Sequence, residues 1–209
     1  MKNSFEKSLG LLIAALSIFL LFPGWIRQGV FADGILYSAV SKNLSQGRGT
    51  VWHPTFSPHL FPHFHEQPPM MFWMQSIFFR IMGDHFWTEK AYCFCMSILV
   101  VVMLAFLFKF FSKNIISKSS ILLPIFFFLI TPVISFVFIN NLEEATLMVF
   151  DLIAVYGLVR YSFSPMKVKW VWFLIGVISI IFAGLTKGIQ GLFPIAIPFF
   201  ESSVTSGSW

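Results

Sequence analysis

Four long stretches of the chain contain no charged residue, and they cover residues 8–26, 91–108, 119–142 and 170–186. A helix needs about 20 mostly apolar residues to cross a hydrocarbon core of about 30 Å, so each stretch predicts a membrane-spanning helix. Two weaker spans follow at Thr146 to Tyr161, which contains Asp151, and at Gly188 to Phe200. The pattern predicts an all-α membrane protein with about six transmembrane helices.

The segment between the first two spans, residues 27–90, has a different pattern. It holds all five histidines and four of the nine acidic residues. Apolar positions spaced three and four apart predict one amphipathic helix from Asp33 to Gly47 and a second from Pro69 to Gly83. The aromatic content of the second favours a helix that lies in the membrane interface. Residues 47–69 hold five prolines without periodicity, which predicts a loop.

Composition supports a membrane protein. Hydrophobic residues make up 57% of the chain and charged residues 11%, with a mean hydropathy of +0.81. The net charge of +5 would suggest a nucleic-acid partner in a soluble protein, but here the basic residues lie in loops, so we expect no nucleic acid. Cys93 and Cys95 stand two apart on one predicted helix and point to different faces, which predicts neither a disulfide nor a metal site.

Lysine and arginine set the orientation. With the N-terminus inside, the inner segments carry most of these cations: Lys2, Lys7, Lys109, Lys113, Lys118, Arg160, Lys167 and Lys169. This distribution places the segment from Arg27 to Lys90 outside the cytoplasm. The first span has no small-x-small cleavage site after it, so we interpret it as a retained helix and not a signal peptide.

Four motifs occur in a fixed order along the chain: "DGILYSAVSKNL", "HEQPPMMFWMQSIFFRIMGD", "LEEATLMVFDLIAVYGLVR" and "GLTKGIQGLFP". In this order they resemble membrane glycosyltransferases of the C-type fold, namely the bacterial relatives of protein O-mannosyltransferases and of lipid A aminoarabinose transferases. The resemblance covers nearly the whole chain. It implies that residues 1–209 are the N-terminal part of a transmembrane glycosyltransferase domain, with 27–90 as its outer catalytic loop and the family's C-terminal part absent.

The resemblance also implies an activity. Members of this family transfer a sugar from a polyprenyl-phosphate donor to an acceptor, which can be a lipid, a glycan or a protein, on the outer face of the membrane. For this chain it implies an enzyme of the cytoplasmic (inner) membrane, a multi-pass protein whose partners are the polyprenyl-phosphate sugar donor, membrane lipid and the acceptor. No cofactor is required by the motifs beyond a possible divalent metal.

Within the resemblance, Asp33 matches the essential acid of the first loop and would be the general base. The alternative is a helix N-cap, which an Asp supplies at about 1 kcal/mol. Tyr37 shares its helix face one turn on. Glu66 and Gln67 would contact the donor phosphate, Gln67 standing where relatives often have a lysine. Lys187 would add a positive charge for that phosphate, or alternatively extends to the interface.

His65 and Glu66, with His59 and His63 nearby, are candidate ligands of a divalent metal. Their spacing matches no fixed metal motif, so solvated or acceptor-contacting side chains are the alternative. Glu143 and Glu144 suit the N-terminus of a helix, and Asp151 suits the protein interior.

Two other functions compete with sugar transfer. A transporter or metal-collecting protein would use the histidine-rich loop, but it would need polar residues repeated in the spans, where only Asp151 qualifies. A truncated, non-catalytic membrane protein is the third hypothesis.

The orientation is directly testable. A cysteine at Ser57 should react with a membrane-impermeant thiol reagent in intact spheroplasts, because the predicted first loop lies outside. Labelling that appears only after lysis would contradict this topology and the lipid-donor function that depends on it.

Overall fold

The structure is a computed structural model that describes residues 2–114 and 121–197. In these ranges the chain is helical, and two isolated bridges are its only β pairings. The helices are α1 (Lys2–Ile26), α2 (Ala32–Ser45), α3 (Met70–Met82), α4 (Phe86–Asn114), α5 (Leu122–Leu129), α6 (Pro132–Ile139), α7 (Glu143–Phe163), α8 (Met166–Lys187) and the short 3-10 helix η1 (Gly188–Ala196).

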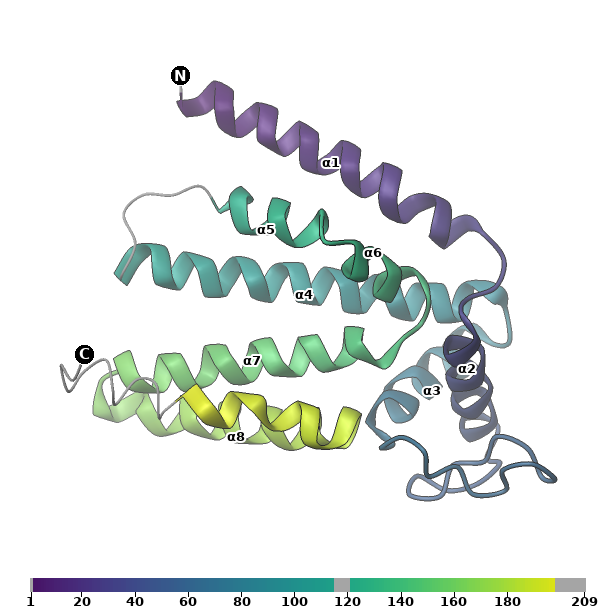
Figure 1. Cartoon of the computed structure of the whole chain (residues 1–209). Helices are drawn as coiled ribbons and strands as arrows, with labels where there is room; N and C mark the ends of the chain where they lie inside the picture. The colour runs from purple at the N-terminus through teal and green to yellow at the C-terminus, as the bar shows by residue number, and fades with distance from the viewer. Residues whose placement is uncertain (1, 115–120, 198–209) are drawn as a thin grey trace.

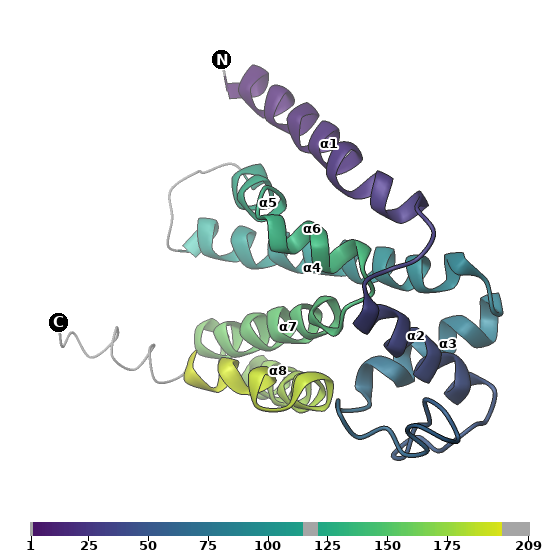
Figure 2. The same ribbon diagram turned by 45° about the vertical axis from the view of Figure 1, so that its right-hand side comes forward.

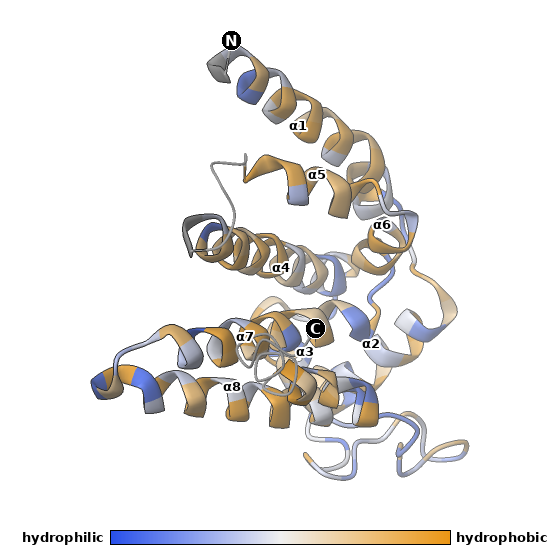
Figure 3. Ribbon diagram, turned by 60° about the vertical axis from the view of Figure 1, so that its left-hand side comes forward, coloured by the Kyte–Doolittle hydropathy of each residue, from blue (hydrophilic) through white to orange (hydrophobic). Residues whose placement is uncertain are grey.

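The helices form two regions. The long helices α1, α4, α7 and α8 run lengthwise beside one another with α5 and α6, whereas α2, α3 and the loop between them gather at one end (Figures 1 and 2). Hydrophobic positions dominate α1, α4 and α5, while hydrophilic positions collect around α2 and at the turn between α7 and α8 (Figure 3). The polar segment between the first two spans therefore covers one end of a membrane-type bundle.

Four helices are long and apolar enough to cross a membrane: Ser4–Ile26, Phe86–Ser112, Glu143–Phe163 and the run Met166–Ala196. The spans predicted at 8–26, 91–108, 146–161 and 170–186 each lie inside one of them. The predicted all-α membrane fold is thus confirmed: three of these helices were predicted from charge-free stretches, and the fourth, 146–161, from a weaker apolar run that contains Asp151.

The span predicted at 119–142 is not one straight helix. Its described part consists of α5 and α6, which meet at a bend of 77°. Pro132 begins α6 and has no N–H to continue the helical ladder, and Thr131 before it is extended, with φ −74° and ψ 115°. The pair counts as one broken span at most, and Ser119 and Ser120 lie outside the described residues.

The sixth span, predicted at 188–200, also differs from the prediction. Gly188 adopts a φ of +59°, which ends α8 and reverses the chain. η1 then runs back against α8, so closely that a Cβ on Gly191 would lie 2.2 Å from the carbonyl carbon of Ala183. Although Met166–Ala196 has the composition of one span, this reversal makes it a hairpin. The nine residues of η1 rise roughly 18 Å, too short to cross.

Over residues 2–114 and 121–197 the structure thus gives four candidate spans, or five with the bent pair. Residues 198–200 of the sixth predicted span and Lys118 of the predicted inner loop lie outside the described residues.

The two helices predicted in the first loop are confirmed within about two residues at each end. α2 and α3 pack against each other, and their buried faces carry Val40, Met71 and Phe72, each fully buried. Gly47 and Gly83 follow them with φ of +76° and +77°, positive values that glycine adopts more readily than other residues.

A buried asparagine joins these helices to the bundle. Asn141 lies between α6 and α7 with φ +57°, a conformation that Asn tolerates better than most residues. Its Nδ2 donates to the Gly34 carbonyl at 2.9 Å and to Ser38 Oγ at 2.8 Å. Its Oδ1 accepts from Gln75 Nε2 at 2.5 Å and from the Cys93 thiol at 3.5 Å. One side chain therefore ties α2, α3 and α4 to the start of α7.

Lys90 makes a second junction at the same end. It is 3% exposed, and its ammonium donates to the backbone carbonyls of Gly24, Gly29 and Ile139 at 3.0–3.1 Å. A buried ammonium is stable only when its donors are satisfied, and these three acceptors use all of them. Lys90 thus fixes the end of α1 against the ends of α4 and α6.

We expect Asn141→Ala to destabilise the protein in detergent. The change removes the hydrogen bonds that hold three helices and leaves several buried groups unsatisfied, at about 1–3 kcal/mol each. Thermal unfolding followed by size-exclusion chromatography measures the loss. Gln28→Ala, at an exposed position, is the matched control and should be neutral. Equal melting temperatures for the two variants would contradict the junction.

Candidate functional site

Asp33 lies in the first turn of α2, where its side chain is exposed. The N-cap of α2 is Phe31, with φ −58° and ψ 157°, and no side chain caps this helix. The Phe31 N–H instead donates to Asn140 Oδ1, 2.9 Å away. The alternative of an N-cap role for Asp33 is therefore wrong, because Asp33 is the second residue of the helix and is exposed to solvent.

Gly34, directly after Asp33, is required by packing. A Cβ at this position would lie 2.0 Å from the Asn140 carbonyl oxygen, a contact that only backbone movement could relieve. The close approach explains why a residue without a side chain stands directly after Asp33. It also presses the first turn of α2 against the turn that leads into α7.

Tyr37 lies one turn after Asp33 and is 6% exposed, with its ring centroid 5.8 Å from that of Phe72. Burial raises the pKa of Tyr37 well above its ordinary value. Four neighbouring carboxylates raise this pKa further: Glu143, Asp33, Glu144 and Glu66. The phenol therefore stays protonated and can act as a hydrogen-bond donor. The same interactions place Asp33 and Glu66 in one acidic neighbourhood with the N-terminus of α7.

Lys187, at the end of α8, points into this neighbourhood. Its ammonium lies 3.1 Å from Glu143 Oε1 and donates to Glu144 Oε1. The Lys187 side chain is only 18% exposed and that of Glu143 only 1%. Neither carboxylate oxygen of Glu143 accepts a well-oriented hydrogen bond from the described residues. Lys187 is therefore more than a lysine that extends to the interface without a partner, because its ammonium is held between two glutamates.

Sequence reasoning assigned Glu143 and Glu144 only a favourable position at a helix N-terminus. The structure instead makes them the ion-pair partners of Lys187. α7 and α8 pack as an antiparallel hairpin, so the first residues of α7 meet the last residues of α8. Acids at the start of one span and a lysine at the end of the next are compatible with such a pair, but the sequence does not show that the two helices pack together.

The loop that carries His65, Glu66 and Gln67 is anchored by Phe64. This ring is 1% exposed and lies 5.6 Å from the ring of Phe72. The Phe64 N–H donates to the Pro54 carbonyl at 2.7 Å. Glu66 and His65 are exposed beside this anchor, and Gln67 is half-buried. The anchor fixes where the Glu-x-Pro-Pro motif leaves the loop and enters α3.

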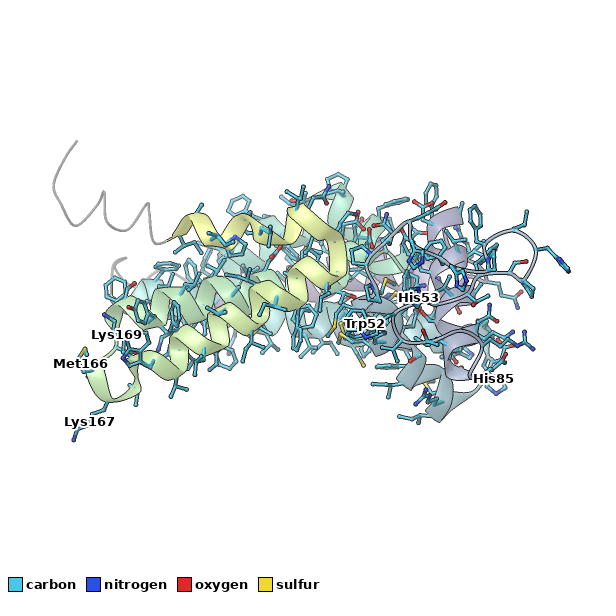
Figure 4. All side chains as sticks on the ribbon, turned by 90° about the horizontal axis from the view of Figure 1, so that it is seen from below. Trp52, His53, His85, Met166, Lys167 and Lys169 are labelled. Atoms are coloured by element: carbon cyan, nitrogen blue, oxygen red, sulfur yellow. The ribbon has the colours of Figure 1, made fainter. Side chains whose placement is uncertain are left out.

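Three histidines meet in the same loop. His53 Nδ1 lies 3.4 Å from His65 Nε2, and the ring centroids of His53 and His63 are 5.7 Å apart. In Figure 4 His53 stands beside Trp52 at the loop end of the molecule. Within residues 2–114 and 121–197, however, no three His, Cys, Asp or Glu side chains are placed to hold a metal ion. The predicted metal role of His65 and Glu66 is not supported by this geometry.

The structure therefore brings Asp33, Tyr37, Glu66 and Lys187 to one end of the bundle. Glu143 and Glu144 join them. No described contact ties His65 or Gln67 to that group. An exposed carboxylate can accept a proton, while a buried phenol and an ammonium can donate hydrogen bonds to an anionic oxygen. This combination suits transfer chemistry in which one group loses a proton and another gains negative charge.

Solved structures with the same fold are known. The chain superposes on ArnT from Cupriavidus metallidurans in the apo state with a TM-score of 0.72 and 14% identity, over 97% of this chain and 37% of that one. The structure of that ArnT bound to undecaprenyl phosphate superposes with a TM-score of 0.72 and 16% identity, over 95% of this chain and 36% of that one. Comparison with curated proteins finds no match. The chain thus shares the fold of ArnT over little more than a third of the ArnT length.

A family model also matches. The model of dolichyl-phosphate-mannose-protein mannosyltransferases aligns with residues 66–204, which is more than half of the chain. It begins at Glu66 of the Glu-x-Pro-Pro motif and includes the glutamates of α7 and Lys187. The resemblance seen in the sequence motifs is confirmed by fold and by family, and the chain belongs to the dolichyl-phosphate-mannose-protein mannosyltransferase family.

Proposed function

We propose that this chain is the N-terminal part of a membrane glycosyltransferase that moves a sugar from a polyprenyl-phosphate donor to an acceptor. Family membership supports transfer chemistry, and an ArnT of the same fold was solved with undecaprenyl phosphate. The observation that carries the proposal is the exposed Asp33 carboxylate, one helical turn before the buried phenol of Tyr37 and beside the glutamates of α7.

In the proposed reaction Asp33 takes the proton of an acceptor hydroxyl. The hydroxyl oxygen bonds to the anomeric carbon of the sugar, and the bond from that carbon to the phosphate oxygen breaks. The polyprenyl phosphate leaves with the electron pair. Tyr37 and Gln67 donate hydrogen bonds to the phosphate, and Glu66 orients the sugar. We assign no metal role to His65 or Glu66, because the described residues supply no third ligand.

Lys187 is the proposed charge partner of the phosphate, although its ammonium is already paired. Glu143 is 1% exposed, whereas the Glu144 side chain is 39% exposed. We propose that the phosphate displaces Glu144 and leaves the buried pair of Glu143 and Lys187 intact. An exchange of one anion for another avoids the large cost of leaving a half-buried ammonium unpaired.

The proposed orientation puts α2, α3 and their loop on the outer side of the cytoplasmic membrane, as the basic inner segments predict. The bundle supports this arrangement, because Lys167 and Lys169 lie at the end opposite His53 and His85 (Figure 4). The acceptor is a lipid, a glycan or a protein that presents a hydroxyl at that surface.

Asp33→Asn tests the general base. The amide keeps the size of the side chain but cannot accept the proton, so sugar transfer by the full-length protein should fall roughly 10²- to 10⁴-fold. Binding of the polyprenyl-phosphate donor should change little. Asp84→Asn is the matched control, since Asp84 lies in the same segment but pairs with Lys42. Transfer within a few-fold of the parent for Asp33→Asn would remove Asp33 from the mechanism.

Lys187→Gln tests the phosphate contact. Loss of a charge-assisted hydrogen bond should weaken donor binding about tenfold or more, measured by titration with polyprenyl phosphate. The double variant Glu143→Gln, Lys187→Gln removes the buried charge along with its partner and separates binding from misfolding. Lys167→Gln, at the opposite end of α8, should bind normally. Normal affinity in both Lys187 variants would assign this lysine to folding alone.

A further inference from the structure

A pocket lies at the other end of the bundle from Asp33. It has a volume of about 420 Å³ and forms where α4 and α7 end. Two cations, three phenylalanines and a tyrosine supply most of its wall: Lys109, Arg160, Phe106, Phe110, Phe163 and Tyr156. Among the described residues no acidic side chain lines it. A pocket with two positive charges and aromatic walls favours an anion that carries apolar groups.

Arg160 is the central residue of this pocket. Its guanidinium carbon lies 4.7 Å from the ring centroid of Trp172 and 5.6 Å from that of Phe110. Its Nε is buried and has no hydrogen-bond partner within the described residues. Cation–π contacts stabilise the charge but satisfy none of the five N–H donors of the group. A partly buried guanidinium whose Nε–H has no partner is suited to an oxyanion, which Arg binds through paired hydrogen bonds.

The ordinary interpretation is that Arg160 only balances the partial negative charge at the end of α7. That role requires neither burial nor stacking, because a solvated arginine in the last turn performs it equally well. Lys109 from α4 converges on the same pocket, which the helix-end interpretation does not explain. Two cations from different helices around one hollow indicate a shared ligand.

The position of the pocket indicates which anion. α4 and α7 are both membrane-spanning candidates, so their ends meet the bilayer surface. Phe106 and Phe163 are 51% and 56% exposed beside the pocket and offer an apolar path into the hydrocarbon region. The volume suits a phosphate headgroup and its glycerol, while acyl chains would extend along the helices. Basic pockets between helices at a membrane surface bind anionic lipid headgroups.

We propose that the pocket between α4 and α7 binds an anionic phospholipid, with its phosphate held by Arg160 and Lys109, at the membrane face opposite Asp33. The site is separate from the sugar-transfer chemistry and would fix the α7–α8 hairpin in the bilayer. Figure 3 shows this end of the hairpin as a hydrophilic region on otherwise apolar helices.

The test uses the purified chain in neutral detergent, titrated with phosphatidylglycerol or with phosphatidylcholine, and bound lipid is counted by native mass spectrometry. The parent should bind phosphatidylglycerol saturably and at least about tenfold more tightly than phosphatidylcholine. The double variant Lys109→Gln, Arg160→Gln should lose this preference. The control Lys167→Gln, Lys169→Gln removes two cations from the same end that do not line the pocket, and should keep it.

Several results would overturn the proposal. If both double variants lost the preference for phosphatidylglycerol to the same extent, surface charge alone would attract the lipid. The absence of saturable phosphatidylglycerol binding by the parent would mean that the pocket holds no lipid. Full competition by inorganic phosphate at the lipid's concentration would indicate a site for soluble anions. If the double variant misfolds, Lys109→Gln alone decides: Lys109 is exposed, so the fold should survive while binding weakens several-fold.

Discussion

The candidate site depends on one buried amide. Asn141 connects α2, α3 and α4 at the point where α7 begins, and its neighbour Asn140 accepts the hydrogen bond that starts α2. In a membrane-type fold the helices gain little from hydrophobic contact with each other, because lipid is equally apolar, so buried polar contacts have more influence on packing. This junction places the first turn of α2, with Asp33, against the glutamates of α7. Without it, the carboxylates would lie on independently moving elements.

Much of this arrangement could be predicted from the sequence. Charge-free length identifies three of the four straight spans, and three-four periodicity with Gly47 and Gly83 identifies both helices of the first loop. These predictions succeed because they depend on local properties, namely hydropathy, helical period and the conformational freedom of glycine. The resemblance carried by "HEQPP" and "DGILY" likewise depends on short local motifs.

The predictions that failed depend on contacts between distant segments. The span at 119–142 breaks at Pro132, and the reversal at Gly188 replaces a sixth crossing with a hairpin. A proline or a glycine in an apolar run is compatible both with a continuous span and with a break in it. The pairing of Lys187 with Glu143 and Glu144 requires knowledge that α7 and α8 are antiparallel neighbours. The sequence allowed Asp33 to be a helix cap or a catalytic acid; the N-cap at Phe31 argues against the first role, and the second stays a prediction.

The charge arrangement at the site bears on the order of events in the proposed reaction. Four carboxylates lie close enough to Tyr37 to raise its pKa, and the Lys187 ammonium is already paired with two of them, Glu143 and Glu144. Because Glu144 is the more exposed partner, it is the one that a phosphate can displace. The phosphate would then take the place of the Glu144 carboxylate on the Lys187 ammonium, so donor binding would exchange one anionic partner of that ammonium for another while the buried Glu143 stays paired.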